Sequence, residues 1–110
     1  MKFLTISKVR DSAALFPPAT VRQLLEATLA FVDAQKKAGK LLEAYALPGG
    51  GAAVICEHPS AEDAAQTIAS IPVGGLMSHE VYPLADFNVV MKASIESLKT
   101  AEKLFPSPPK

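Results

Sequence analysis

The chain has 110 residues, and its 11 basic residues balance its 11 acidic residues, so the formal net charge is zero. This length fits one domain with one core, and an apolar content of 49% excludes a disordered chain. The neutral balance, without a block of Lys and Arg, argues against nucleic acid or anionic membranes as partners. The N-terminal apolar stretch is too short for a signal peptide, so we expect a cytoplasmic protein.

The first part of the chain predicts a strand and a helix separated by a loop. Residues 2–9 alternate in polarity with the period of two that is typical of a strand. The polar residues that follow, and the pair Pro17-Pro18, interrupt regular structure and predict a loop of about ten residues. From residue 19 to residue 38, apolar side chains recur at helical spacing, and the segment ends with two lysines and Gly39, as expected for an amphipathic helix.

The rest of the chain predicts a hairpin, a second helix, a fourth strand and a last helix. Residues 40–47 alternate as a strand, and residues 52–57 form a second strand that is apolar almost throughout, so its faces are not assigned; a turn of Pro48 and three glycines joins the two. Ser60 and Asp63 have the spacing of a capping box, although aspartate is shorter than the usual glutamate, and the helix that they begin ends at Pro72. Residues 77–84 form the fourth strand, and Asp86 begins the last helix.

This order of elements, βαββαβ with an extra C-terminal helix, predicts an α+β protein with the ferredoxin-like arrangement. We expect a single domain over residues 1–105, a flexible tail over residues 106–110, and two helices on one face of a four-stranded antiparallel sheet. On the helix side, alternation places Leu4, Ile6, Leu42, Ala44, Ala46, Met77 and Val81. On the open side, it places Phe3, Thr5, Ser7, Leu41, Glu43, Tyr45, Ser78, Glu80 and Tyr82.

The open face mixes apolar and polar side chains, and a face this apolar usually marks an interface or a groove. The last helix could cover it. A second subunit could cover it too, and we predict a twofold homodimer whose sheets pack together, with a cleft in each subunit.

Several phrases resemble the muconolactone isomerase family. They are Gly-Lys-Leu-Leu-Glu-Ala-Tyr-Ala-Leu at 39–47, Pro59-Ser60, Ser70-Ile71-Pro72 and Glu-Val-Tyr-Pro-Leu at 80–84. The resemblance covers about residues 1–86 and implies the ferredoxin-like fold and assembly through dimeric α+β barrels into larger oligomers. It also implies proton transfer within an unsaturated lactone. Because the second strand and the segment after the second helix depart from the family pattern, no family catalytic residue is carried over.

Glu43 and Glu80 are acid/base candidates, because an apolar cleft can raise the pKa of a carboxyl until it exchanges protons near neutral pH. A salt bridge or a solvated strand edge is the alternative. Tyr45 and Tyr82 would orient a substrate oxygen. Ser7 and Ser78, on the same predicted face, are further substrate-binding candidates.

His79 is a third acid/base candidate, because histidine titrates near neutral pH. Alternation places it on the helix side as a structural residue, unless a bulge after Gly74-Gly75 reverses the strand. His58 is expected on the surface at a helix entrance, and Cys56 is expected to be a small core residue. The two histidines make no metal site, and we expect no metal or other cofactor.

Two functions of different classes remain open at this point. One is a small-molecule enzyme that isomerises a lactone or another carbonyl-activated cyclic substrate by proton transfer. The other is a non-catalytic dimeric binding or assembly protein. A cofactor-independent monooxygenase of the same barrel superfamily is a further alternative, because a fold does not select one chemistry.

Overall fold

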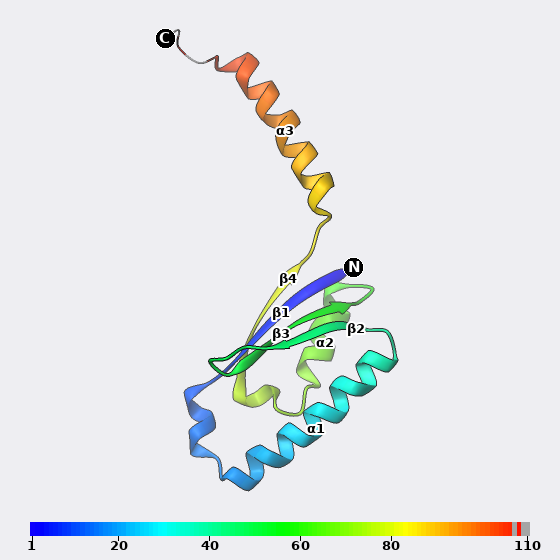
Figure 1. Ribbon diagram of the computed structural model, residues 1–110, viewed down its shortest axis with the longest axis vertical. Coiled ribbons are helices and arrows are strands. Elements are labelled where there is room, and N and C mark those ends of the chain that lie inside the picture. Colours follow the sequence, from blue (N-terminus) through cyan, green and yellow to red (C-terminus); the bar gives the residue numbers. More distant parts are fainter. Residues whose placement is uncertain (107, 109–110) are drawn as a thin grey trace.

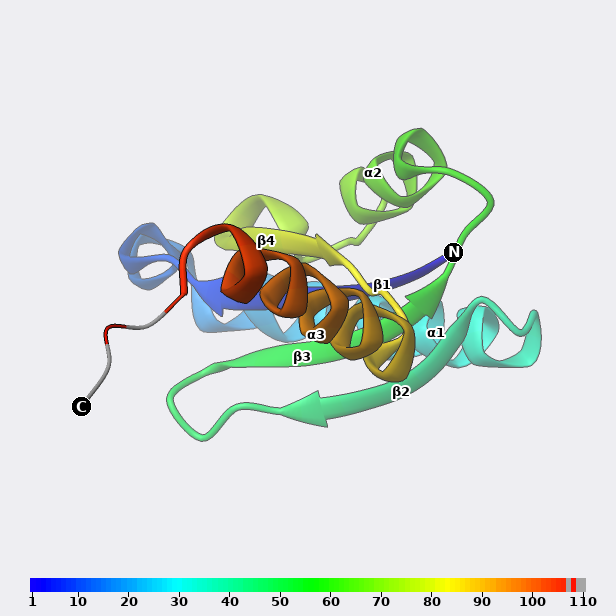
Figure 2. The ribbon, with the colours of Figure 1, turned by 90° about the horizontal axis from the view of Figure 1, so that it is seen from above.

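The computed structural model describes residues 1–106 and 108. Four strands, β1 (Lys2–Val9), β2 (Leu41–Ala46), β3 (Gly51–Glu57) and β4 (Met77–Pro83), form one antiparallel sheet. Their order across the sheet is β2-β3-β1-β4, which Figure 2 shows from above. The helices are α1 (Pro18–Lys37), α2 (Ala61–Ala69) and α3 (Phe87–Leu104), with short 3-10 turns η1 (Asp11–Leu15) and η2 (Gly74–Leu76). The predicted ferredoxin-like arrangement with an extra C-terminal helix is confirmed (Figure 1).

The helices begin within one residue of the positions that the sequence indicated, but α2 ends at Ala69, three residues before the predicted stop at Pro72. Gly39 follows α1 with a positive φ of 75°, a conformation that glycine adopts without strain. The Ser60 hydroxyl accepts a hydrogen bond from the Asp63 backbone N–H at 3.1 Å and caps α2. The Asp86 carboxylate accepts one from the Val89 N–H at 2.9 Å and caps α3. These caps satisfy N–H groups that have no partner within the helix.

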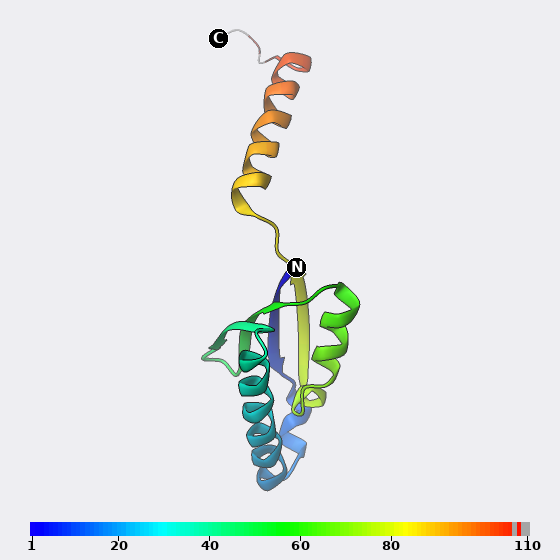
Figure 3. The same ribbon diagram turned by 90° about the vertical axis from the view of Figure 1, so that its right-hand side faces the viewer.

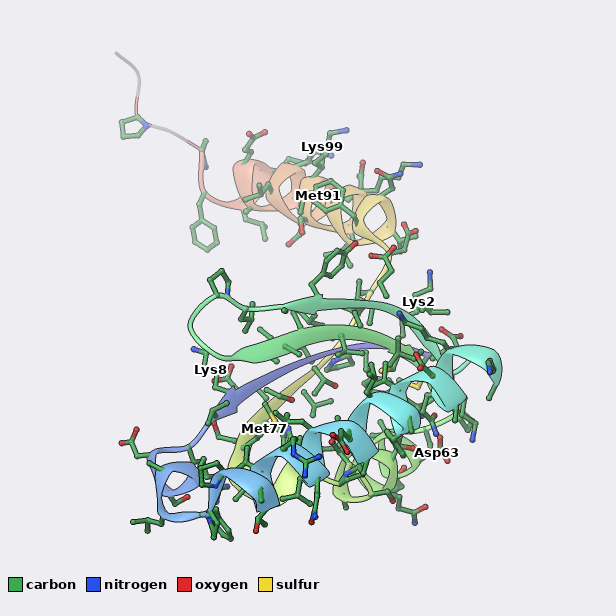
Figure 4. The ribbon with its side chains drawn as sticks, turned by 60° about the horizontal axis from the view of Figure 1, so that its bottom comes forward. Lys2, Lys8, Asp63, Met77, Met91 and Lys99 are labelled. Carbon is green, nitrogen blue, oxygen red and sulfur yellow. The ribbon has the colours of Figure 1, made fainter. Side chains whose placement is uncertain are left out.

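Helices α1 and α2 lie on one side of the sheet, and Met77 lies between the sheet and α1 (Figure 4). The buried apolar side chains come from the sheet, α2 and the segment before β4. They are Phe3, Leu41, Ala64, Val73 and Leu76. The Thr28 hydroxyl accepts a hydrogen bond from the Val73 N–H at 3.1 Å, and this bond joins α1 to the segment that leads into β4.

The faces of β1 are opposite to those that alternation predicted. Phe3, Thr5 and Ser7 are buried under the helices, so Leu4 and Ile6 face the open side. Polarity misleads here because β1 is a central strand whose two faces are both partly covered. The Ser7 hydroxyl is tolerated on the helix side because it has a hydrogen-bond partner on β4.

The start of β2 also differs from the prediction. Leu41, predicted on the open face, is buried on the helix side. A register irregularity between Leu41 and Glu43 lets the strand change its alternation at this point, and Glu43 remains on the open face opposite Ile55.

Helix α3 extends beyond the end of the sheet where the N-terminus lies, and it stands clear of α1 and α2 (Figure 3). The molecule therefore measures 69 × 31 × 22 Å, with a Cα radius of gyration of 19.9 Å. A compact chain of this length would have about 13 Å. The single domain over residues 1–105 stays a prediction, and the predicted tail includes residues 107, 109 and 110, which lie outside the described residues. No helix in the described part of the chain is both long and apolar enough to cross a membrane.

Candidate functional site

A cavity of about 330 Å³ lies between the sheet and the two helices that cover it. Its wall is mostly aliphatic and comes from β1, β3, α1, α2 and the segment around η2. This volume is at the lower end of the range of small-molecule pockets, which are mostly apolar and carry a few polar groups. The polar side chains of the wall include Thr5, Ser7, Gln35, Cys56 and His58.

His58 is the titratable side chain of this wall that departs most from its prediction. It is 4% exposed, so the expectation of a surface histidine is wrong. Its Nδ1 lies 2.8 Å from the Asp63 carboxylate, and its ring lies 6.1 Å from the Phe3 ring, tilted by 57°. Because an ionised carboxylate only accepts hydrogen bonds, Nδ1 carries the proton in the neutral ring and Nε2 keeps a lone pair.

The local sequence explains why these two side chains meet. In a capping box, the side chain at the third helical position reaches back to the backbone N–H of the cap residue. Asp63 occupies that position in α2, and its carboxylate pairs with His58, two residues before the Ser60 cap. The negative charge near the start of α2 is also stabilised by the helix dipole. Half-exposed Asp63 thus holds the orientation of a buried imidazole.

A second histidine, His79 of β4, lies beside the C-terminal end of β1, whereas His58 lies beside Phe3 at its N-terminal end. Ser7 and His79 are directly opposite each other on β1 and β4, and the Ser7 Oγ is 2.7 Å from the His79 Nδ1. The His79 Nε2 is 3.3 Å from the Gly74 carbonyl oxygen. A carbonyl can only accept, so Nε2 donates to it and Nδ1 accepts from the Ser7 hydroxyl. His79 therefore lies on the helix side, where alternation placed it.

Two further groups of the cavity wall have no counterpart among the predicted site residues. The Gln35 Oε1 is buried and has no hydrogen-bond partner in the described part of the chain. Such a group is available to a donor on a ligand. Burial raises the pKa of the Cys56 thiol, which favours its protonated form.

The open face of the sheet carries two matching tyrosine–glutamate pairs, one on each edge strand. The Tyr45 hydroxyl donates to the Glu43 carboxylate at 2.8 Å on β2, and the Tyr82 hydroxyl donates to Glu80 on β4. Both hydrogen bonds are exposed. They are the main cause that raises the pKa of each tyrosine, with the charge of the glutamate second.

The structure thus divides the predicted site residues between two faces. Glu43, Tyr45, Glu80 and Tyr82 lie on the open face, and Ser78 lies beside them on β4. Ser7 and His79 lie on the helix side, which corrects the predicted face of Ser7. The sheet separates the two sets, so they do not line one cleft.

Sequence reasoning missed His58, Asp63 and Gln35. The signal for the first two was present, because an aspartate in place of the glutamate of a capping box is free to pair elsewhere. Gln35 gave no signal, since one polar residue on an amphipathic helix is ordinary. Among residues 1–106 and 108, no three His, Cys, Asp or Glu side chains gather as metal ligands.

Comparisons with solved structures identify the fold. Muconolactone isomerase, solved at 3.3 Å resolution, matches with a TM-score of 0.68 and 21% identity over 78% of this chain and 90% of that chain. The 5-chloro-2-hydroxyhydroquinone dehydrochlorinase of Burkholderia phenoliruptrix AC1100, in complex with 2,5-dihydroxybenzoquinone, matches with a TM-score of 0.61 and 19% identity. That match covers 81% of this chain and 98% of that chain.

These likenesses confirm the resemblance to muconolactone isomerase at the level of the fold. Searches against protein-family models and against curated proteins gave no match. The two alignments leave about a fifth of this chain uncovered, which is close to the share of the chain that follows residue 86.

Proposed function

We propose that this protein is a small-molecule enzyme that transfers a proton within a lactone or another carbonyl-activated cyclic substrate. The substrate would bind in the cavity between the sheet and the helices. His58 would be the acid/base, and Asp63 would position its ring. The observation that carries this proposal is a buried imidazole, paired with a carboxylate, in the wall of an apolar cavity.

The chemistry needs only one group that accepts and returns a proton. A carbonyl makes the hydrogen on the neighbouring carbon acidic, and the His58 Nε2 would remove it. The same nitrogen would return the proton to another carbon of the conjugated system, so the double bond moves and no electrons are gained or lost. Proton transfer by a positioned side chain typically accelerates a reaction by about 10²–10⁴-fold.

Asp63 supports this role through His58 and does not need to touch the substrate. Its carboxylate accepts a hydrogen bond from the Nδ1–H, which fixes the tautomer and stabilises the imidazolium that forms during transfer. Gln35 would accept a hydrogen bond from a hydroxyl of the substrate, since its Oε1 is free. Ser7, which also lines the cavity, would supply a second polar contact, about 13 Å along β1 from the Phe3–His58 end.

Proton exchange with deuterated water tests the proposal without knowledge of the product. Muconolactone and 2,5-dihydroxybenzoquinone, which the names of the two similar structures supply, are suitable first probes for turnover and for binding. We expect the protein to catalyse deuterium incorporation into the lactone. His58→Gln should reduce the rate at least ~100-fold, and Asp63→Asn at least ~10-fold. Glu62→Gln, the same chemical change on an exposed neighbour in α2, is the matched control.

The outcome that contradicts the proposal is equally specific. If Glu43→Gln or Glu80→Gln abolishes exchange and His58→Gln does not, the reaction takes place on the open face of the sheet. If no variant differs from the parent, none of these groups is the acid/base.

One observation favours a second function, a non-catalytic binding or assembly protein that forms homo-oligomers. The open face and α3 both expose large apolar side chains, including Tyr45 and Leu98. Such surfaces usually mark an interface. A protein of this kind would bind a probe in the cavity without exchanging its protons, so the same experiment separates the two functions.

A further inference from the structure

Helix α3 carries an apolar stripe that nothing in the structure covers. Seven side chains of this stripe and its margin are more than two fifths exposed. They are Phe87, Val90, Met91, Ile95, Leu98, Leu104 and Phe105. At 100° per residue, Lys92, Glu96, Lys99 and Lys103 fall on the opposite side of the helix. The helix is therefore amphipathic, with one apolar and one charged face.

An isolated helix of 18 residues with two serines and a threonine is marginal in water, because most helical stability in proteins comes from packing of the apolar face. The sheet of the same chain does not supply that packing, because α3 extends beyond the end of the sheet (Figure 3). The Leu84 N–H donates to the Lys2 carbonyl at 2.8 Å, so the chain is still held to β1 at this point. Only Ala85 and Asp86 remain before α3.

We propose that α3 pairs with α3 of a second copy of this chain, in antiparallel orientation and centred on residue 96. The stripe follows steps of four and three residues along the helix, which is the spacing of a coiled-coil seam. The six positions of the seam alternate between large and small side chains in its central part. They are Phe87, Met91, Ser94, Leu98, Ala101 and Phe105.

Antiparallel pairing about residue 96 brings large side chains opposite small ones. Met91 meets Ala101 of the partner subunit, and Leu98 meets Ser94 of the partner subunit. Phe87 meets Phe105 of the partner subunit at each end. In the central part of the seam, this alternation fills the space between the helices evenly, as close packing requires.

The margins of the seam fit the same arrangement. Val90 lies beside Leu104 of the partner subunit, and Ile95 lies beside its own copy. No two like charges face each other there, because the three lysines point away from the seam. The contact is isologous, so one helix surface serves both copies.

The parallel orientation fits less well on two grounds. It would place Met91 and Leu98 against their own copies and Ser94 against Ser94, which crowds some layers and leaves gaps in others. It would also bring two sheet-and-helix bodies to the same end. The shorter dimensions of the molecule are 31 and 22 Å, whereas packed helices lie only 8–10 Å apart.

Sedimentation of the full chain at micromolar concentration tests the pairing. We expect a mass of at least twice 11.6 kDa for the parent. Leu98→Asp, which puts a charge into the seam, should halve that mass or raise the dissociation constant at least ~10-fold. Thr100→Asp adds the same charge on the opposite side and should change neither. A monomeric parent, or equal effects of the two variants, would overturn the proposal.

Disulfide cross-linking tests the orientation independently, in a Cys56→Ala background that removes the only native cysteine. A mixture of Met91→Cys chains and Ala101→Cys chains should form the mixed disulfide. Met91→Cys alone should not cross-link, because its copies would lie about 15 Å apart along the helix, and a disulfide needs Cα atoms within about 7 Å. Efficient cross-linking of Met91→Cys with itself, or failure of the mixture, contradicts the antiparallel register.

Discussion

Each tyrosine of the chain donates a hydrogen bond to the glutamate two residues before it, on the exposed face of an edge strand. The chain has two tyrosines and no tryptophan, so phenolate absorbance reports on these two pairs alone. Because the hydrogen bond needs the protonated phenol, it holds the pKa of both Tyr45 and Tyr82 above the usual 10.0.

We therefore expect the spectroscopic titration to have its midpoint above pH 10 for both residues. Glu80→Gln should move the midpoint for one half of the absorbance change, that of Tyr82, back toward pH 10. Glu43→Gln should do the same for the other half, that of Tyr45. The native state gains from these bonds below pH 10, and the gain disappears as the pH rises through the native pKa. A parent protein that titrates like free tyrosine contradicts the pairing.

The Cys56 thiol provides a probe inside the cavity. Burial raises its pKa, and the thiolate is the reactive form, so a disulfide reagent should react more slowly with the native protein than with the unfolded chain. A ligand in the cavity should slow the reaction further. Reaction at the same rate in native and unfolded protein would show that the thiol is not held there.

At the residue scale, the sequence indicated local caps better than pairs of functional groups. The hydroxyl of Ser60 and the carboxylate of Asp86 cap their helices as predicted, because both contacts form within one turn. His58 was misplaced because its burial depends on Phe3, which is far away in sequence. A pattern of polarity holds no direct information on such a contact.

Among the elements, the hairpin of β2 and β3 turns through two glycines with positive φ, Gly50 and Gly51, and Gly51 has the least room for a side chain. Gly51 has a φ of 134°, and a Cβ at this position would meet the Ser7 carbonyl oxygen of β1. We expect Gly51→Ala to reduce the free energy of unfolding by more than about 1 kcal/mol, measured by denaturant titration. Gly49→Ala, where a Cβ meets nothing within 4 Å, is the control and should be close to neutral. Similar losses in both variants would contradict this account of the turn.

The types and order of the elements were predictable because their periodicity and their end signals agree with each other. The faces of β1 were not predictable in the same way. A central strand has a neighbour on each edge, so side chains on both of its faces are at least partly covered, and Thr5 and Ser7 can be buried while Leu4 faces the open side without a visible break in the pattern. The irregularity beside Leu41 likewise depends on pairing with β3.

For the whole molecule, the feature that sequence reasoning did not predict is its shape. The last helix was expected from its spacing, and its position was left open between its own subunit and a partner. The radius of gyration of 19.9 Å shows that α3 is not part of a compact body. The proposed pairing of α3 with a second copy would cover the apolar stripe that this shape leaves exposed.

The central claim is that ligands bind between the sheet and the helices, on the side of His58. The five isoleucines of the chain report on this directly by methyl NMR. Ile68 and Ile71 line the cavity, Ile6 and Ile55 lie on the open face, and Ile95 lies on α3. During titration with muconolactone or 2,5-dihydroxybenzoquinone, we expect the methyl signals of Ile68 and Ile71 to shift and those of Ile6 and Ile55 to stay. Shifts confined to Ile6 and Ile55 would contradict the claim and place the site on the open face.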